Sequence, residues 1–112
     1  MPKPNMIKVG PLEYSIEWED GLEVDGMLCH GVMASIDSSI RIDSSQPLMV
    51  QQVTLLHEAL HAILTESGAA DVLGIKQEEM VVRSISTQLI QMIQESPSLV
   101  SFITRKPRKN DN

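Results

Sequence analysis

The chain has 112 residues, of which 42% are hydrophobic and 21% charged, and its formal net charge is -6. This length corresponds to one domain, and the composition is that of a globular protein with a modest core. A single cysteine excludes an intrachain disulfide framework, and no apolar run is long enough to cross a membrane. Because residues 1–10 (MPKPNMIKVG) also lack the apolar stretch of a secretory signal, we expect a cytoplasmic protein.

The first half of the chain has the patterns of short strands. In residues 12–19 (LEYSIEWE), apolar and polar side chains alternate, which predicts a strand with one buried face. Residues 27–36 (MLCHGVMASI) alternate less cleanly, and Gly31 marks a bulge or a close backbone approach. Residues 38–43 (SSIRID) alternate again, with two isoleucines on one face. These segments predict three to four short antiparallel strands.

The second half has the patterns of helices. Pro47 is expected in the first turn of a helix that carries apolar residues at helical spacing and ends near Gly68. A second helix is predicted over residues 76–95, and Ser96 and Pro97 begin a last short helix. The apolar stripe of the second helix consists of Val81, Val82, Ile85, Leu89, Met92 and Ile93. We therefore expect an α+β domain, in which two helices pack on one face of a small antiparallel sheet.

The charge is divided unevenly along the chain. Residues 105–112 (RKPRKNDN) hold four of the nine basic residues and one of the fifteen acidic residues, so this tail carries +3 and residues 1–104 carry -9. We expect residues 1–104 to form the domain and the basic tail to be flexible. The acidic body argues against broad nucleic-acid binding, which leaves weak contacts through the tail as the remaining route.

The sequence HEALH at residues 57–61 is an HExxH motif inside the first predicted helix. Residues four apart leave a helix on the same face, so the imidazoles of His57 and His61 can reach one zinc ion. Glu58 is turned about 100° away, where a carboxylate can exchange protons with an attacking water without ligating the metal. The alternative is a core helix with two polar histidines, but chance matches in such a context are rare.

A catalytic zinc site takes a third protein ligand, which must come from elsewhere in the chain. The extended three-histidine motif is absent, since Ser67 stands six residues after His61. The second predicted helix offers Glu78 and Glu79 in its first turns. Counting 100° per residue places Glu78 at the middle of the apolar stripe and Glu79 on its flank, which narrowly favours Glu78. The remaining acid is then an outer partner of a ligand, or both acids complement the helix dipole.

Other residues of chemical interest carry weaker signals. His30 is a candidate ligand or oxyanion donor, but a lone histidine on a strand is more often structural. Cys29 beside it is more often a core residue than a metal ligand. The aromatic side chains Tyr14 and Trp18 share one strand face, which is typical of packing.

The strands, the HExxH helix and the early glutamates of the next helix resemble the zincin metallopeptidases. Within these, residues 40–97 resemble the gluzincin branch, and specifically the compact ImmA/IrrE-type enzymes of phages and bacteria. The resemblance implies one zinc ion held by His57, His61 and either Glu78 or Glu79, with Glu58 as the catalytic base. It also implies that the strand near residues 40–43 offers its edge to an extended peptide.

The sequence departs from the family pattern in the second helix. The family's Glu-x-x-Ala-Asn-like run, followed by Phe-Ala, is replaced by EEMVVRSIS. Matching Ile85-Ser86 to the Phe-Ala pair favours Glu79, against the periodicity argument, so both glutamates remain candidates.

The leading hypothesis is a zinc-dependent peptidase that hydrolyses protein or peptide substrates with water activated by the metal. The resemblance suggests that it is phage-encoded and acts in the host cytoplasm. The alternative is a catalytically weak or inactive zinc-binding protein that serves as a protein-interaction module. Glu58 argues against this alternative, since a purely structural zinc site does not need it.

Overall fold

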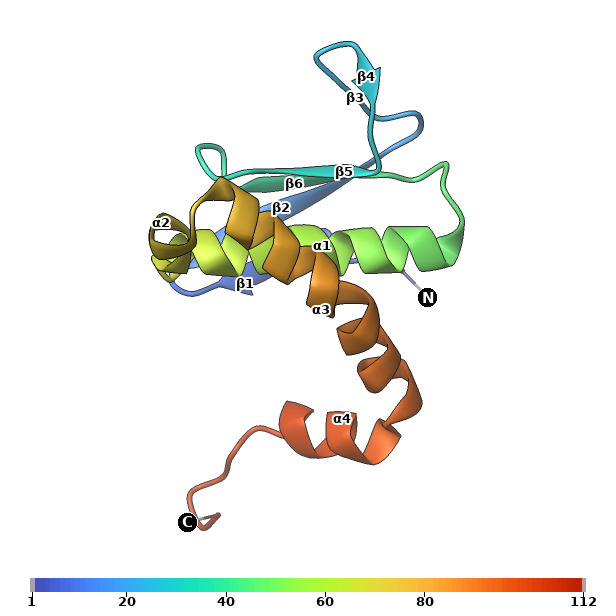
Figure 1. Ribbon diagram of the computed structural model, residues 1–112. Coiled ribbons are helices and arrows are strands. Elements are labelled where there is room, and N and C mark those ends of the chain that lie inside the picture. The colour runs from blue at the N-terminus through green and yellow to red at the C-terminus, as the bar shows by residue number, and fades with distance from the viewer. Residues whose placement is uncertain (1, 112) are drawn as a thin grey trace.

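The computed structural model describes residues 2–111 and places a mixed four-stranded sheet, with a separate two-stranded hairpin, ahead of four helices (Figure 1). The strands are β1 (Met6–Val9), β2 (Leu12–Glu19), β3 (Glu23–Val24), β4 (Met27–Leu28), β5 (Gly31–Ala34) and β6 (Ser39–Asp43). The helices are α1 (Leu48–Glu66), α2 (Ala69–Leu73), α3 (Ile75–Glu95) and α4 (Pro97–Thr104). The expected α+β class is confirmed.

The main sheet has the strand order β1-β2-β6-β5. Its outer pairs, β1 with β2 and β5 with β6, are antiparallel, as expected. The central pair is parallel, with Ile16 opposite Ile40 and Trp18 opposite Ile42, so the expectation of a wholly antiparallel sheet was wrong. The small β3–β4 hairpin follows β2, and the β5–β6 hairpin then brings β6 back onto β2 in the same direction. The strand β6 is therefore paired along both edges.

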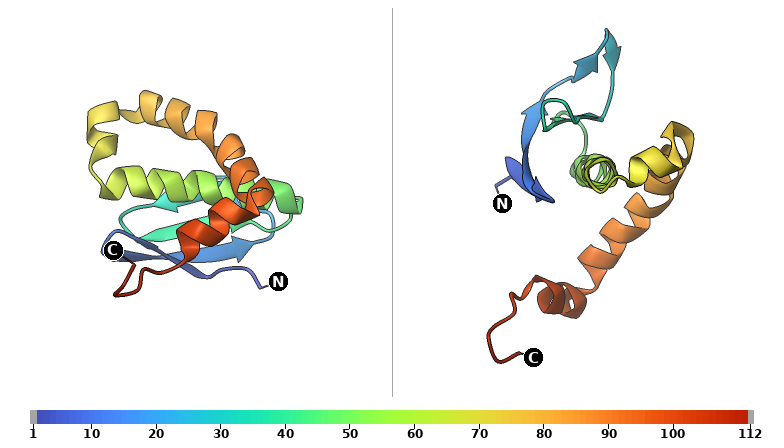
Figure 2. Two further views of the ribbon diagram at one scale, coloured as in Figure 1. Left: turned by 90° about the horizontal axis from the view of Figure 1, so that it is seen from below. Right: turned by 90° about the vertical axis from the view of Figure 1, so that its left-hand side faces the viewer.

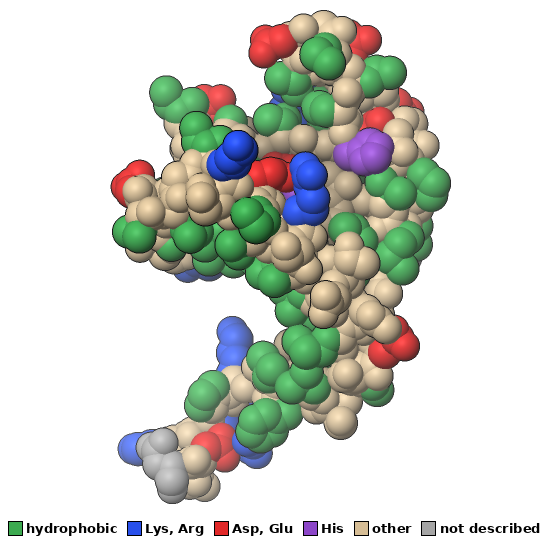
Figure 3. All heavy atoms as spheres, viewed as in Figure 1, with side chains coloured by type: hydrophobic (Ala, Val, Ile, Leu, Met, Phe, Trp, Pro, Cys, Tyr) green, Lys and Arg blue, Asp and Glu red, His purple; other side chains and the backbone are tan. Residues whose placement is uncertain are grey.

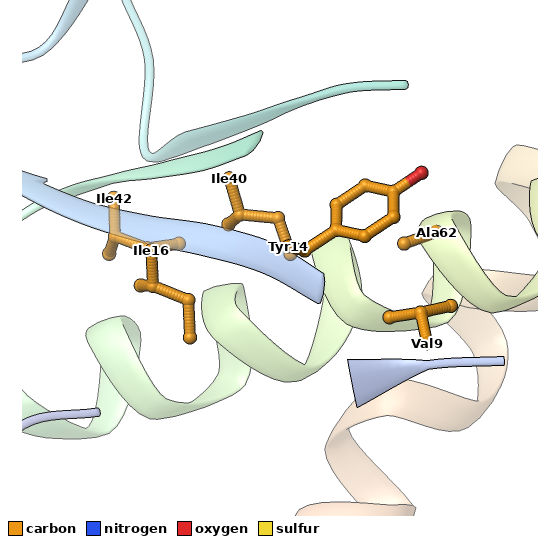
Figure 4. Close-up of a cluster of buried hydrophobic side chains, with 6 residues drawn as sticks. All are labelled: Val9, Tyr14, Ile16, Ile40, Ile42 and Ala62. Atoms are coloured by element: carbon orange, nitrogen blue, oxygen red, sulfur yellow. The ribbon is translucent and has the colours of Figure 1, made fainter. Parts of the chain in front are cut away.

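The core lies between the sheet and α1. Tyr14 and Ile16 point inward from β2, as the period-two pattern predicts, and both are buried. Ile40 and Ile42 of β6 are fully buried beside them, and Ala62 of α1 closes the cluster (Figure 4). The strand β1 was missed in the sequence, although its Val9 belongs to this cluster.

The helices form two further layers. Helix α1 contacts β1, β5 and β6, whereas α3 contacts α1, α2 and α4 but no strand in the part of the chain that the structure describes (Figure 2). The expectation that both long helices pack on the sheet is therefore correct for α1 and wrong for α3. Because α3 lies on α1, the side chains between these helices come from two segments close in sequence.

The apolar stripe of α3 is only partly covered. Of its six residues, Val82 is fully buried, whereas Val81, Ile85, Met92 and Ile93 are 38–45% exposed. Helix α4 contacts α3 alone and buries none of its side chains completely. Within residues 2–111, no helix combines the length and the apolar character that crossing a membrane requires.

The connection from the sheet into α1 is held by Asp43, the last residue of β6. Its Oδ1 accepts hydrogen bonds from the Gly21 amide, and from both the amide and the hydroxyl of Ser45. Its Oδ2 accepts a hydrogen bond from the Gln46 side chain. These bonds hold the pKa of Asp43 well below its usual range, with the Ser45 hydroxyl as the largest cause. The start of α1, and with it the HExxH motif, is thereby fixed relative to the sheet.

Candidate metal centre

Helix α1 presents the two histidines of the motif side by side. The Nε2 atoms of His57 and His61 lie 3.2 Å apart, and their rings meet edge to face. Both side chains are largely buried, with 23% and 14% of their surface exposed. Leu55 of the same helix packs against the core cluster, which fixes the rotation of α1. The four-residue spacing thus brings the two Nε2 atoms within reach of a single ion, as the motif predicts.

Glu79 of α3 completes this group. Its Oε2 lies 2.9 Å from Nε2 of His61, and its Oε1 lies 3.3 Å from Nε2 of His57. One ligand atom from each of the three residues can be chosen so that all lie within 4.8 Å of one another. Across residues 2–111 no other histidine, cysteine and carboxylate group meets the same description.

Glu78 occupies a different position. Its Oε2 lies 2.5 Å from Nδ1 of His61, on the opposite side of the ring from Glu79. Glu78 lies on the inner face of α3, as its position in the apolar stripe predicts, and only 14% of its side chain is exposed. On this face of α3, however, Glu78 meets Nδ1 of His61, the ring nitrogen that points away from His57 and Glu79. The geometry therefore favours Glu79 over Glu78 as the third ligand, and Glu78 as the group that orients His61.

Glu58 lies beside the histidines without joining them. Burial raises its pKa to about 6, with nearby Glu79 acting in the same direction. The interactions with His61 and with the backbone amide of Met33 act in the opposite direction. A carboxyl group with this pKa is mostly ionised at neutral pH but exchanges protons more readily than an ordinary glutamate.

The surroundings of His57 favour its neutral form. Its pKa is lowered, mainly because burial disfavours the imidazolium form, while Glu79 partly offsets this effect. The neutral imidazole is the form that binds metal ions. At neutral pH, His57 therefore carries the neutral imidazole that a metal ligand requires.

An open cleft of about 380 Å³ borders this group. Its walls come from α1, from α3 and from the start of β5. The lining residues are His30, Gly31, Val53, Thr54, His57, Glu58, Glu79, Arg83, Ser86 and Thr87. In the space-filling view, acidic side chains lie in a recess that basic and histidine side chains border (Figure 3).

The free sheet edge at this cleft belongs to β5. The expected edge, residues 40–43, is β6, whose two sides are occupied by β2 and β5, so that expectation was wrong. Strand β5 pairs with β6 on one side only. A Cβ atom on Gly31 would lie 2.5 Å from Cγ2 of Thr54, so the close backbone approach predicted at this glycine is an approach to α1.

The other candidates divide between the cleft and the core. His30 is exposed and lines the cleft, although its sequence signal for a functional role was weak. Tyr14 is a core residue whose hydroxyl donates a hydrogen bond to Glu66, and Trp18 packs at the edge of the core. Cys29 is half-buried, and burial raises the pKa of its thiol.

Arg83 also lines the cleft, although it was not among the residues predicted from the sequence. It stands one helical turn after Glu79, and its Nη2 lies 3.4 Å from Oε1 of that residue. The four-residue spacing from Glu79 was the available signal, since it places both side chains on one face of α3.

The donor set suits zinc. Two imidazole nitrogens and a carboxylate oxygen are ligand types that this ion prefers, and three protein ligands leave a position open. A carboxylate on the far nitrogen of one histidine, as Glu78 provides for His61, is the usual outer partner of a metal-binding imidazole.

Comparison of the chain with protein-family models finds no matching family, and comparisons with curated proteins and with solved structures find no match either.

Proposed function

We propose that this protein is a zinc-dependent peptidase of the gluzincin type, resembling the ImmA/IrrE enzymes and acting on protein or peptide substrates in the cytoplasm. His57, His61 and Glu79 would hold one zinc ion, and Glu58 would act as the general base. The observation that carries the proposal is the meeting of the Glu79 carboxylate with both Nε2 atoms of the motif.

The chain's own residues suggest how the reaction would be arranged. When bound, zinc supplies Lewis acidity, which lowers the pKa of water and polarises a peptide carbonyl. Glu58 accepts a proton from the attacking water and delivers it to the leaving amine, for which its pKa of about 6 is suited. Glu78 would accept a hydrogen bond from Nδ1 of His61, which would leave the Nε2 lone pair of that ring free for the ion.

The free edge of β5 supports a binding mode for the substrate. An extended peptide can add to this edge through backbone hydrogen bonds, because one side of β5 is unpaired within the main sheet. The close approach of Gly31 to Thr54 sets how far this edge stands from the HExxH helix. The hollow along Val32 and Met33 is bordered by Glu58 and by the proposed ligands, so a peptide added to β5 would lie beside them.

Metal analysis and one variant test the proposal together. Purified protein should contain one zinc per chain, and chelation should abolish cleavage in a peptide mixture analysed by mass spectrometry. Glu58→Gln should retain the zinc and lose turnover by at least about 100-fold, the usual range for a general base. Protein that contains no metal would refute the metal centre. A Glu58→Gln variant that cleaves normally would refute the mechanism, and bound zinc without cleavage by the native protein would favour the interaction module.

A further inference from the structure

Arg83 gives the cleft beside the proposed ligands a permanent positive charge. Of the ten residues that line this cleft, Arg83 is the only lysine or arginine. Its side chain is 78% exposed, so its donors are available to a bound molecule. The two acidic lining residues, Glu58 and Glu79, both belong to the proposed catalytic set.

The contact of Arg83 with Glu79 does not occupy the guanidinium group. The distance of 3.4 Å from Nη2 to Oε1 is long for a charged hydrogen bond, and exposed pairs at this helical spacing are weak. A guanidinium group has five donors, and this contact uses one. If Glu79 ligates a metal, its negative charge is shared with the ion and attracts Arg83 less. The fork of donors then remains free for an anion.

The two sides of the ligand group differ in charge. The cleft that begins at His30 and Gly31 contains Arg83 together with the side chains of Thr54 and Thr87. A second hollow, of about 440 Å³, extends along β5 past Val32 and Met33. Its lining includes no lysine or arginine. A peptide lying along β5 would therefore meet a cation on the Gly31 side and apolar side chains on the Met33 side.

From this asymmetry we infer that the peptidase selects substrates with a carboxylate on the Gly31 side of the scissile bond, and that Arg83 binds this carboxylate. The inference rests on the proposed function and names its substrate class. A planar guanidinium fork matches a carboxylate in two parallel hydrogen bonds, which is a geometry that lysine cannot reproduce. The carboxylate is either the C-terminus of a peptide or an aspartate or glutamate side chain.

The test uses paired hydroxamates on the zinc-loaded full chain. Each pair shares a hydroxamate for the metal and a tether of two to six methylenes, and ends in a carboxylate or in the matching primary amide. Dissociation constants are measured by calorimetry, so no turnover is needed. For the best tether, the native protein should bind the carboxylate about tenfold more tightly than the amide, as expected for a charge-assisted hydrogen bond.

Three variants locate the effect. Arg83→Gln should reduce the preference to about one, while its affinity for the amide shows that the metal site persists. Arg83→Lys should retain only part of the preference. Lys8→Gln is the control, since it removes the same charge from an exposed residue of β1 that does not line this cleft, and it should keep the full preference.

The results separate this inference from the proposed function. An amide hydroxamate that binds well without any carboxylate preference overturns the inference and leaves the metal centre standing. A preference that survives in Arg83→Gln also overturns it. Failure of every hydroxamate to bind the zinc-loaded chain would show that the zinc has no open position, which would overturn the proposed peptidase function and the inference with it.

The source of the carboxylate is resolved with two peptides on the zinc-loaded Glu58→Gln variant. One peptide has a free C-terminus and glutamine, and the other has a C-terminal amide and glutamate. The peptide that binds more tightly in an Arg83-dependent way identifies the source. Equal binding of both, unchanged by Arg83→Gln, counts against the inference.

Discussion

Oε2 of Glu78 lies 2.5 Å from Nδ1 of His61, while the neighbouring residue, Glu79, reaches Nε2 of the same ring. Adjacent glutamates thus contact opposite sides of one imidazole. In the proposed metal centre, Glu78 would orient the ring and Glu79 would share an ion with it, so the two should differ in their effect on metal affinity.

Glu79→Gln should lower zinc affinity far more than Glu78→Gln. Loss of an outer partner of a metal-binding histidine costs about 10–100-fold in affinity, and the glutamine amide oxygen of Glu78→Gln can still accept from Nδ1, so we expect the lower end of that range. Removing the Glu79 carboxylate should exceed the upper end. Competition with a chromophoric chelator measures both values, and the opposite order would exchange the roles of the two glutamates.

Gly31→Ala should destabilise the protein and displace β5 from α1. The added Cβ atom would lie 2.5 Å from Cγ2 of Thr54 and 3.2 Å from the carbonyl oxygen of Arg41. Overpacking of this kind costs about 1–3 kcal/mol of unfolding free energy. Urea denaturation measures the loss. Thr54→Ser removes the clashing methyl group, so the double variant should recover part of the stability, and additive losses would show that the strain lies elsewhere.

Tyr14→Phe should weaken the attachment of β2 to the end of α1. The buried Tyr14 hydroxyl donates a hydrogen bond of 2.6 Å to Oε2 of Glu66, and burial raises the pKa of Tyr14 to about 12. Because Glu66 is only half-buried and can turn to water, we expect a loss of about 1 kcal/mol of unfolding free energy. In a double-mutant cycle with Glu66→Gln, the coupling between the two residues should account for most of it.

Acid should destabilise the connection between β6 and α1. The pKa of Asp43 in the folded protein lies below its ordinary value of 3.8, so the unfolded chain binds a proton first as the pH falls. The contribution of Asp43 is therefore complete above about pH 5, where both states are ionised, and is lost as the pH falls through 3.8 and below. The unfolding free energy of Asp43→Asn should fall less between pH 6 and pH 3 than that of the native protein. Parallel curves for the two proteins would contradict this.

Much of the fold could be predicted because its signals are local. Neighbouring residues carry the alternation over residues 12–19 and the helical spacing on either side of the HExxH motif. Gly68 signals the end of α1, and its φ of 85° in the structure agrees with this role. The parallel pairing of β2 with β6 could not be read in this way. It depends on where the β5–β6 hairpin docks, which is a property of the whole sheet.

The site shows the same limit at smaller scale. His57 and His61 meet because one helix carries both, so their spacing alone predicted it. The distinction between Glu78 and Glu79 depends on the rotation of α3 about its own axis against α1. The apolar stripe correctly placed Glu78 on the buried face of α3, but it could not show that this face meets Nδ1 of His61 rather than Nε2.

His61 and Glu79 are only 18 positions apart, and the segment between them is the end of α1, the short α2 and the start of α3. Closing so short a loop costs little chain entropy. Pairing β2 with β6 instead requires the β3–β4 hairpin and β5 between them to be placed first. We therefore expect the side chains of His57, His61 and Glu79 to come together on a helical hairpin before the sheet is complete. If the proposed centre binds zinc during synthesis, the ion would stabilise the α1–α3 hairpin at an early stage of folding.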